Sequence, residues 1–176
     1  MLIRPLREGN DVLKRKKKIE GEAAEATRQF VGFRIGDELY GIDIGSIQEI
    51  DRMHSITKLP KSLPFIEGVI NLRGGIIPVV DMAKRFGMPP VEVGRRTRII
   101  IAGISEQSVG LIVEQVTEVV ELREDAVEAA PAMAFAVDQK YVEGVGRIDE
   151  TLLIILNLEL LFSVEEMNQL QTQQRS

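Results

Sequence analysis

The chain has 176 residues, no cysteine, one histidine and a net charge of −5. This length suits one domain, or two small halves that share a core. The absence of cysteine excludes a disulfide framework and thiolate chemistry, and one histidine cannot build a histidine-rich metal site. The acidic balance disfavours a general nucleic-acid binder, which needs clustered Lys and Arg. No apolar run approaches the ~20 residues of a membrane span and the N-terminus lacks the apolar stretch of a secretory signal, so we expect a cytoplasmic protein.

The first 27 residues form a basic segment. Residues 1–20 carry seven bases and three acids, with the run KRKKK at 14–18. Terminal segments with few apolar groups seldom bury enough surface to become ordered, so we expect a disordered arm. Contact of the basic run with an anionic surface is the alternative.

Two hairpins follow in chain order. FVGFRI (30–35) and LYGIDI (39–44) are short, rich in β-branched and aromatic residues, and separated by Gly36-Asp37-Glu38, which is a hairpin signal. GVINLRGGIIPVVD (68–81) joins two apolar runs through a glycine-rich turn that contains Arg73. Pro78 has no N–H for a ladder, so we expect the strand that contains it to lie at a sheet edge or at a bulge.

Capping residues mark short helices after the two most apolar strands. IIPVV (76–80) and LLIIL (152–156) read as buried strands. Asp81 and Asn157 follow them and can each cap a helical turn. Ser163 with Glu166 three residues later is a capping box for a last helix.

The strongest signal is an internal repeat. Gly41 aligns with Gly110 at an offset of 69, and Val79 aligns with Ile155 at an offset of 76. The length difference falls in a joining loop, where it is inexpensive. The repeat predicts two similar small barrels that bury these apolar runs, with a first half at 28–90, a second half at 91–167 and a frayed tail at 168–176.

Six segments together resemble the CheW-type chemotaxis coupling proteins: the hairpin with GIDI, then QEI, GVINLRG, IIPVVD, YVEGVG and LELLFSVEEM. The resemblance covers residues 28–167 and leaves out the basic arm. It implies an all-β fold of two five-stranded SH3-like barrels related by a pseudo-twofold, with short helices and a C-terminal helix. It also implies a non-catalytic adaptor without cofactors.

The partners implied by this resemblance are the regulatory domain of a CheA-type histidine kinase and the cytoplasmic tip of methyl-accepting chemoreceptors, in membrane-associated arrays. Nucleic acid and direct membrane insertion are not expected. Two alternatives stay open at this point. One is an adaptor of a related array, such as one for twitching motility, and the other is a small-barrel protein that binds nucleic acid.

The resemblance also nominates a receptor-binding patch. Glu49 and Arg73 match positions that form a salt bridge on the receptor-facing surface of the first barrel. Ile47, Gly68 and Val69 flank this pair in sequence and are the predicted apolar part of the patch, with ordinary barrel core as the alternative for Ile47 and Val69. The kinase contact is expected on the second barrel, without assigned residues.

The repeat places acids where the first copy has a complementary pair. Glu118 and Asp149 occupy the positions equivalent to Glu49 and Arg73, so the second pair is predicted to repel. Two barrels with such different charges are expected to meet different partners.

Acid–base catalysis is the remaining possibility for the carboxylates. Asp43, Glu49, Asp51 and Asp81 could be read as paired acids, but Asp81 is a cap and no nucleophile or pKa-matched partner accompanies them. His54 lies in a loop-like context, which is typical of a surface residue. We therefore expect neither an enzyme nor a metal site.

Overall fold

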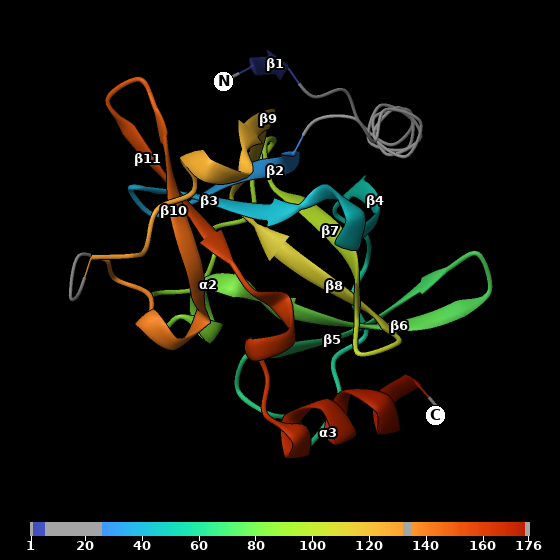
Figure 1. The fold of residues 1–176 in the computed structure, drawn as a ribbon. Helices are drawn as coiled ribbons and strands as arrows, with labels where there is room; N and C mark the ends of the chain where they lie inside the picture. The colour runs from blue at the N-terminus through green and yellow to red at the C-terminus, as the bar shows by residue number, and fades with distance from the viewer. Residues whose placement is uncertain (1, 6–25, 132–134, 175–176) are drawn as a thin grey trace.

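The computed structural model describes residues 2–5, 26–131 and 135–174, and strands dominate it (Figure 1). The strands are β1 (Leu2–Pro5), β2 (Thr27–Ile35), β3 (Glu38–Asp43), β4 (Ile47–Arg52), β5 (Ile66–Leu72), β6 (Gly75–Asp81), β7 (Arg98–Ile104), β8 (Gln107–Val113), β9 (Gln115–Arg123), β10 (Val142–Ile148) and β11 (Thr151–Leu156). The helices are η1 (Ile44–Ser46), α2 (Met82–Arg85), η2 (Glu124–Ala126), η3 (Gln139–Tyr141), η4 (Leu158–Leu160) and α3 (Val164–Gln174), where η marks a 3-10 helix.

The strands form two sheets with the same internal order. One sheet has six strands in the order β1-β9-β2-β3-β11-β10, and the other has five in the order β4-β7-β8-β6-β5. Without β1, the first order becomes the second when each strand is replaced by its counterpart in the other repeat. The two five-stranded SH3-like barrels that the family resemblance implies are therefore confirmed, and β1 is an addition to one of them.

The halves 28–90 and 91–167 do not coincide with the barrels. The β2–β3 hairpin of the first repeat lies in the sheet of β9, β10 and β11, and the β7–β8 hairpin of the second repeat lies in the sheet of β4, β5 and β6. Each repeat therefore lends its hairpin to the other. The reason is the pairing of the last strand of each repeat. In the second repeat β11 pairs in parallel with β3 of the first, and in the first repeat β6 pairs in parallel with β8 of the second. One repeat alone could not form these ladders.

The register of these parallel ladders confirms the sequence repeat. Ile155 pairs with Gly41 in one sheet, and Val79 pairs with Gly110 in the other. These are the residues that the offsets of 69 and 76 align. Val79 and Ile155 are both fully buried. One apolar cluster draws residues from both sheets, so the two barrels share a core.

The predicted caps are confirmed. Asp81 accepts a hydrogen bond from the Lys84 N–H at 3.1 Å and another from the Val91 N–H at 3.0 Å. Ser163 and Glu166 form the reciprocal capping box at the start of α3. The buried Asp81 therefore fastens both α2 and the loop that follows it.

An arginine holds α3 against the rest of the molecule. Arg85 donates to the Leu161 carbonyl at 2.7 Å and to Glu166 at 3.0 Å, and its guanidinium lies over the rings of Phe65 and Phe162. Such a clamp combines charge-assisted hydrogen bonds with cation–π contacts.

Both ends of the folded domain extend beyond the boundaries predicted from the sequence. Leu2–Pro5, inside the segment predicted to be disordered, pair with β9 because a sheet edge offers unpaired N–H and C=O groups to any extended segment. The α3 helix continues to Gln174, beyond the predicted boundary at 167, because Met167 and Leu170 are buried along one face. The KRKKK run lies outside the described residues.

Pro78 does not lie on an edge strand, which was one of the two predicted settings, but the β5–β6 ladder shifts register, as at a bulge, opposite Val79 and Val80. Its strand β6 lies between β5 and β8. The parallel ladder to β8 begins at Val79, so Pro78 stands one residue before the position where a missing N–H would interrupt that ladder.

In the described part of the chain, no helix has the length and apolar character to cross a membrane.

Candidate protein-binding surface

The β5–β6 turn presents Arg73 to solvent. Leu72 and Gly75 face each other as the last strand pair, and the two residues between them both have positive φ, 53° for Arg73 and 83° for Gly74. Two left-handed residues in a two-residue loop are typical of a type I′ hairpin turn. Asn71 supports the turn by accepting a hydrogen bond from the Gly74 N–H at 3.1 Å. A non-glycine residue in this conformation is uncommon, so an arginine here is held outward at some cost in backbone strain.

Arg73 forms the predicted ion pair with Glu49. Its Nη2 lies 3.0 Å from Glu49 Oε1, and the Arg73 side chain is 78% exposed while that of Glu49 is 18% exposed. The pair links the β5–β6 turn to β4. An exposed pair of this kind contributes only about 0–1 kcal/mol to stability. The contribution to stability is therefore small, and the Arg73 guanidinium remains available to a partner while the mostly buried Glu49 holds it in place.

The flanking residues of the predicted patch lie differently from the ion pair. Ile47 is fully buried and belongs to the shared core, so it cannot offer the apolar surface predicted for it in this structure. The reason is a bulge between Ile47 and Glu49, which shifts the alternation along β4 so that Ile47 and Ile50, three positions apart, both turn inward. Gly68 is also buried, and Val69 is half-buried. Arg73 is thus the exposed member of the patch, and Glu49 and Val69 are partly exposed.

Gly68 has a structural role that the sequence did not reveal. Val69 exchanges two backbone hydrogen bonds with Thr57, each 2.9 Å long, so a loop lies directly across β5 here. Gly68 has a φ of 147°, and a Cβ there would overlap the Thr57 carbonyl. Glycine is therefore required at this position by the close backbone approach.

The repeat-related position carries acidic residues instead. Asp149 occupies the β10–β11 turn with a φ of 53°, the same value as Arg73. Burial raises the pKa of the Glu118 carboxyl, and Asp149 raises it further against an opposing effect of Arg34. The direction of the Asp149 effect agrees with the predicted repulsion, but burial is the larger cause of the raised pKa.

The two turns lie far apart in the molecule. In Figure 1 the β5–β6 hairpin (green) and the β10–β11 hairpin (orange) project from opposite sides. The sheet edges next to them differ as well, because β1 covers β9, whereas β4 ends its sheet among the described residues. Two separate surfaces of unlike charge are thus available to different partners.

The candidate catalytic carboxylates have structural partners. Asp43 accepts from the Gly45 N–H at 2.8 Å and pairs with Arg28. Burial raises the pKa of Asp51, but hydrogen bonds from His54 and from a backbone N–H outweigh burial, so the pKa is lowered overall. His54 lies 2.9 Å from Asp51, a partner that its loop-like sequence context did not predict.

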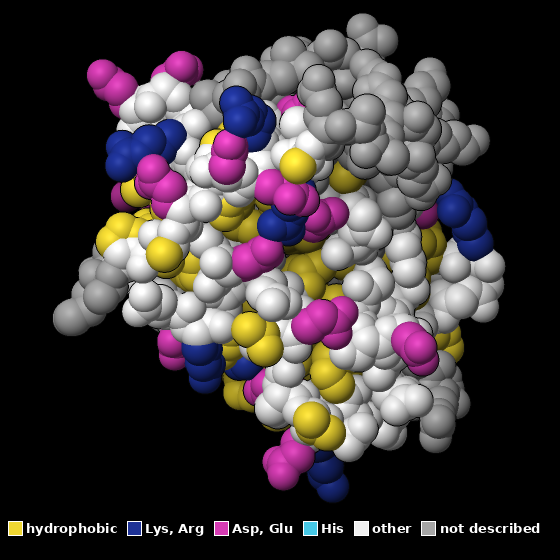
Figure 2. Space-filling view, in the orientation of Figure 1, with side chains coloured by type: hydrophobic (Ala, Val, Ile, Leu, Met, Phe, Trp, Pro, Cys, Tyr) yellow, Lys and Arg dark blue, Asp and Glu magenta, His cyan; other side chains and the backbone are white. Residues whose placement is uncertain are grey.

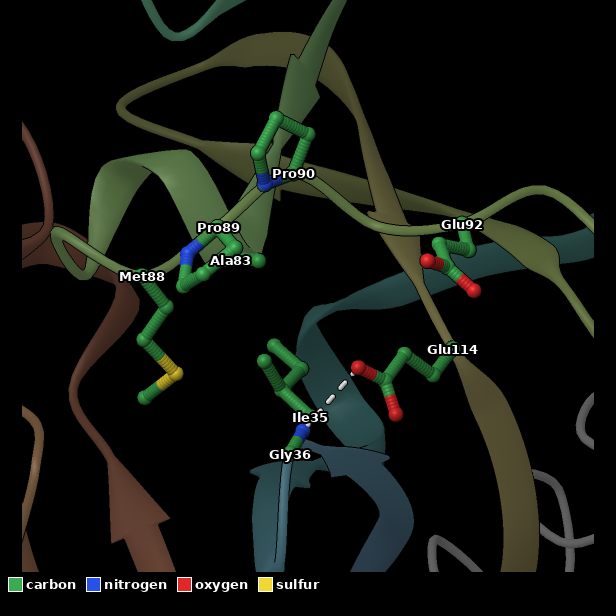
Figure 3. Close-up of a pocket in the computed structure, with 8 residues that line it drawn as sticks. All are labelled: Ile35, Gly36, Ala83, Met88, Pro89, Pro90, Glu92 and Glu114. Carbon is green, nitrogen blue, oxygen red and sulfur yellow. Dashed lines mark hydrogen bonds between the residues drawn. The ribbon is translucent and has the colours of Figure 1, made fainter.

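A cavity of about 480 Å³ opens between α2, the β2–β3 turn and the start of β9 (Figure 3). Glu92 and Glu114 lie on one side of it, and Met88 lies on the other. Glu114 accepts a hydrogen bond from the Gly36 N–H at 3.1 Å, so it fastens the hairpin turn. The residues that line this cavity include no hydroxyl, thiol, imidazole or amine. The described residues hold no cluster of three His, Cys, Asp or Glu that could bind a metal ion.

Exposed apolar side chains occur on the face that carries η4 and α3. Leu160 and Val164 are 54% and 79% exposed. Figure 2 shows hydrophobic side chains on this face with carboxylates among them. Scattered apolar side chains are ordinary on folded proteins, so they do not by themselves define a site.

Comparisons with known proteins agree with the fold. A family model described as the CheW-like domain matches residues 29–166. The chain is 35% identical over 150 residues to "Chemotaxis protein CheW" of Klebsiella aerogenes, covering 85% of this chain and 89% of that protein. It is 32% identical over 142 residues to "Probable chemotaxis protein CheW" of Rhizobium etli, covering 81% and 92%. A solved structure, the scaffolding protein TtCheW from Thermoanaerobacter tengcongensis, matches with a TM-score of 0.74 and 41% identity, covering 82% of this chain and 94% of that one.

Proposed function

Because this chain belongs to the CheW family of chemotaxis scaffolding proteins, we propose that it couples chemoreceptor tips to a CheA-type histidine kinase. In this proposal it works in the cytoplasm at membrane-associated receptor arrays and catalyses no reaction. The methyl-accepting receptor contributes its cytoplasmic tip, and the kinase contributes its regulatory domain.

The exposed Arg73–Glu49 pair is the observation that carries the proposal. Arg73 lies in the β5–β6 turn and its side chain is exposed to solvent, whereas its ion pair with Glu49 adds little to stability. A guanidinium can bind a carboxylate or carbonyl groups of a partner with fork geometry, while Glu49 fixes its direction. We place the receptor contact here, with Val69 as its apolar neighbour.

The kinase contact is proposed on the other barrel. That barrel holds three of the five strands of the second repeat and bears Glu118 and Asp149 where the receptor patch bears a complementary pair. Surfaces that differ in charge select different partners.

The mechanism follows from geometry. The two barrels share a core, so partners that bind opposite sides are held in a fixed relation. A signal passes through the adaptor only as a difference in affinity between two states of the complex.

Charge reversal at Arg73 tests this proposal. Because the pair is exposed, Arg73→Glu should fold almost normally. Like charges at a binding surface and unpaired partner groups cost about 2 kcal/mol or more, which weakens receptor binding by roughly thirtyfold. Kinase binding should change little. Thermal unfolding and titrations with a receptor-tip fragment and with the kinase regulatory domain measure the three quantities.

Arg147→Glu is the matched control. Arg147 is 72% exposed and lies 3.6 Å from Glu128, so it is another exposed arginine in an ion pair, but it lies on β10 of the other barrel. It should leave receptor binding unchanged. Receptor affinity that survives Arg73→Glu, or falls equally with Arg147→Glu, would contradict the assignment of the patch.

A further inference from the structure

The two repeats fasten their hairpin turns in different ways. At the offsets of 69 and 76, Ser105 and Glu159 are the counterparts of Gly36 and Ala83. In the second repeat, Glu159 reaches from η4 to the β7–β8 turn, where it accepts hydrogen bonds from the Ser105 N–H at 3.2 Å and from the Ser105 hydroxyl at 2.7 Å. In the first repeat, Ala83 is too short to reach the β2–β3 turn, and the cavity of about 480 Å³ lies between α2 and that turn. The first repeat therefore leaves open the place that the second fills with its own side chain.

Two carboxylates lie on one side of this cavity (Figure 3). Glu114 is fixed at its backbone and at its side chain, because its N–H donates to the Arg34 carbonyl at 3.2 Å and its Oε1 accepts from the Gly36 N–H at 3.1 Å. Glu92 lies on the same side, on the loop after α2. Among the described residues, neither carboxylate forms an ion pair, and no lysine, arginine or histidine lines the cavity. The cavity therefore holds uncompensated negative charge.

The rest of the lining is apolar and held in place. Apart from Gly36, it consists of Ile35, Ala83, Met88, Pro89 and Pro90. The Met88 N–H donates to the Ala83 carbonyl at 2.8 Å, before the two prolines. The Val91 N–H donates to the buried Asp81 at 3.0 Å, after them. Because the loop is tied on both sides and proline fixes φ, little backbone freedom is left for a ligand to restrict.

From these observations we infer that the cavity accepts a lysine or arginine side chain of a partner protein. Such a side chain has an apolar stem and a cationic head, so the stem can pack on the apolar lining while the head donates charge-assisted hydrogen bonds to the carboxylates. The volume lies within the range of roughly 300–1,000 Å³ that is typical of pockets for organic groups, so it exceeds the needs of a bare metal ion.

The residues next to the lining favour a protein over a free amine. Val93 follows Glu92 and is 66% exposed, and Pro89 and Pro90 are exposed as well. Apolar side chains and methionine around a charged anchor are typical of protein interfaces. A partner that inserts a basic side chain would cover these residues, whereas a free amine would leave them in water.

A capped arginine provides the probe. N-acetyl-arginine amide is titrated into the isotope-labelled full chain at low salt, because screening weakens such contacts, and the NMR shifts of the Gly36 and Glu92 amides report binding. N-acetyl-citrulline amide is the matched probe, since citrulline has nearly the shape of arginine without its charge. It should bind at least about fivefold more weakly, because a hydrogen bond to a carboxylate is stronger when its donor is charged.

Variants test the two carboxylates. Glu92→Gln should weaken binding of the capped arginine by at least about threefold, because it removes one charge from the cavity. Glu114→Gln should do the same, and it keeps an oxygen that can accept from the Gly36 N–H. Glu106→Gln is the matched control, because Glu106 is exposed in the β7–β8 turn of the other repeat and does not line the cavity. It should leave binding unchanged. Thermal unfolding checks that each variant is folded.

This site is separate from the proposed receptor patch. Arg73 precedes β6 and α2 follows it, so the patch and the cavity lie at opposite ends of that strand. Arg73→Glu should therefore leave binding of the capped arginine unchanged, and the outcome at one site does not decide the other.

Five results would overturn the inference. They are no shift of the Gly36 and Glu92 amides with the capped arginine, equal affinity for the arginine and citrulline probes, equal losses for Glu92→Gln and Glu106→Gln, putrescine binding more tightly than the capped arginine, and self-association of the chain in sedimentation that Glu92→Gln abolishes. The last two would identify a polyamine site and an interface between two copies of this chain, respectively.

Discussion

Gly68→Ala is expected to be one of the most destabilising small substitutions in this protein. The added methyl would overlap the Thr57 carbonyl oxygen and come within 2.7 Å of its carbon. Both of those atoms are backbone, so no side chain can rotate away to relieve the contact. The φ of 147° adds strain, because side-chain-bearing residues rarely adopt it.

The magnitude follows from two contributions. Backbone strain of this kind costs about 1–3 kcal/mol. Separating the strands would also break the two hydrogen bonds between Thr57 and Val69, which contribute about 1 kcal/mol each. A loss of roughly 3–5 kcal/mol against a total of about 5–15 should lower the Tm by roughly 6–20 °C.

Gly74→Ala separates strain from overlap. Gly74 has a φ of 83°, but an added Cβ there would meet nothing within 4 Å. It should cost only about 1 kcal/mol, or roughly 2–4 °C, in the same circular dichroism melting experiment. If Gly68→Ala melts within about 2 °C of Gly74→Ala, the close approach to Thr57 is not a constraint and the reasoning is refuted.

Two further predictions concern the core and the acidic pair. Val79→Asp and Ile155→Asp should each abolish cooperative unfolding, because both sites are fully buried and an unpaired charge there costs several kcal/mol; a folded variant in a melting experiment would show that the core is misplaced. Glu118→Gln should raise the Tm at neutral pH by about 1–2 °C, because it removes a partly buried charge and the repulsion from Asp149, which together outweigh the lost attraction to Arg34. The raised pKa of Glu118 in the folded state means that the native state holds its proton more tightly than the unfolded state does. The ionised carboxylate therefore destabilises the native state only as the pH rises above the pKa of Glu118 in the unfolded chain. The gain in Tm from Glu118→Gln should vanish in melting experiments at acidic pH, and a gain that is independent of pH would contradict this.

Local features of the fold could be predicted because their signals are contained in a few neighbouring residues. The turn at Gly36, the cap at Asp81 and the capping box of Ser163 and Glu166 each depend on residues within four positions of one another. The repeat gave the two barrels, since it aligns Val79 with Ile155.

The candidate site could be predicted in part. The pairing of Arg73 with Glu49 came from the family resemblance and is confirmed as an ion pair, while its role in receptor binding stays a prediction. The sequence left two settings open for Ile47, the binding patch and the barrel core, because a bulge between Ile47 and Glu49 that no local pattern announces determines which side chains of β4 turn inward.

By itself, the amino-acid sequence determined the strands, their turns, the caps and the existence of two related halves, because hydrophobic period and turn chemistry act over short distances. Only the tertiary structure decided that each half lends its hairpin to the other, since parallel pairing joins strands that are distant in the chain. The same long-range pairing sets Arg52 opposite Arg98 and lays Thr57 across Gly68. Contacts of this kind arise from the register of strands that meet only after folding, and no local signal records them.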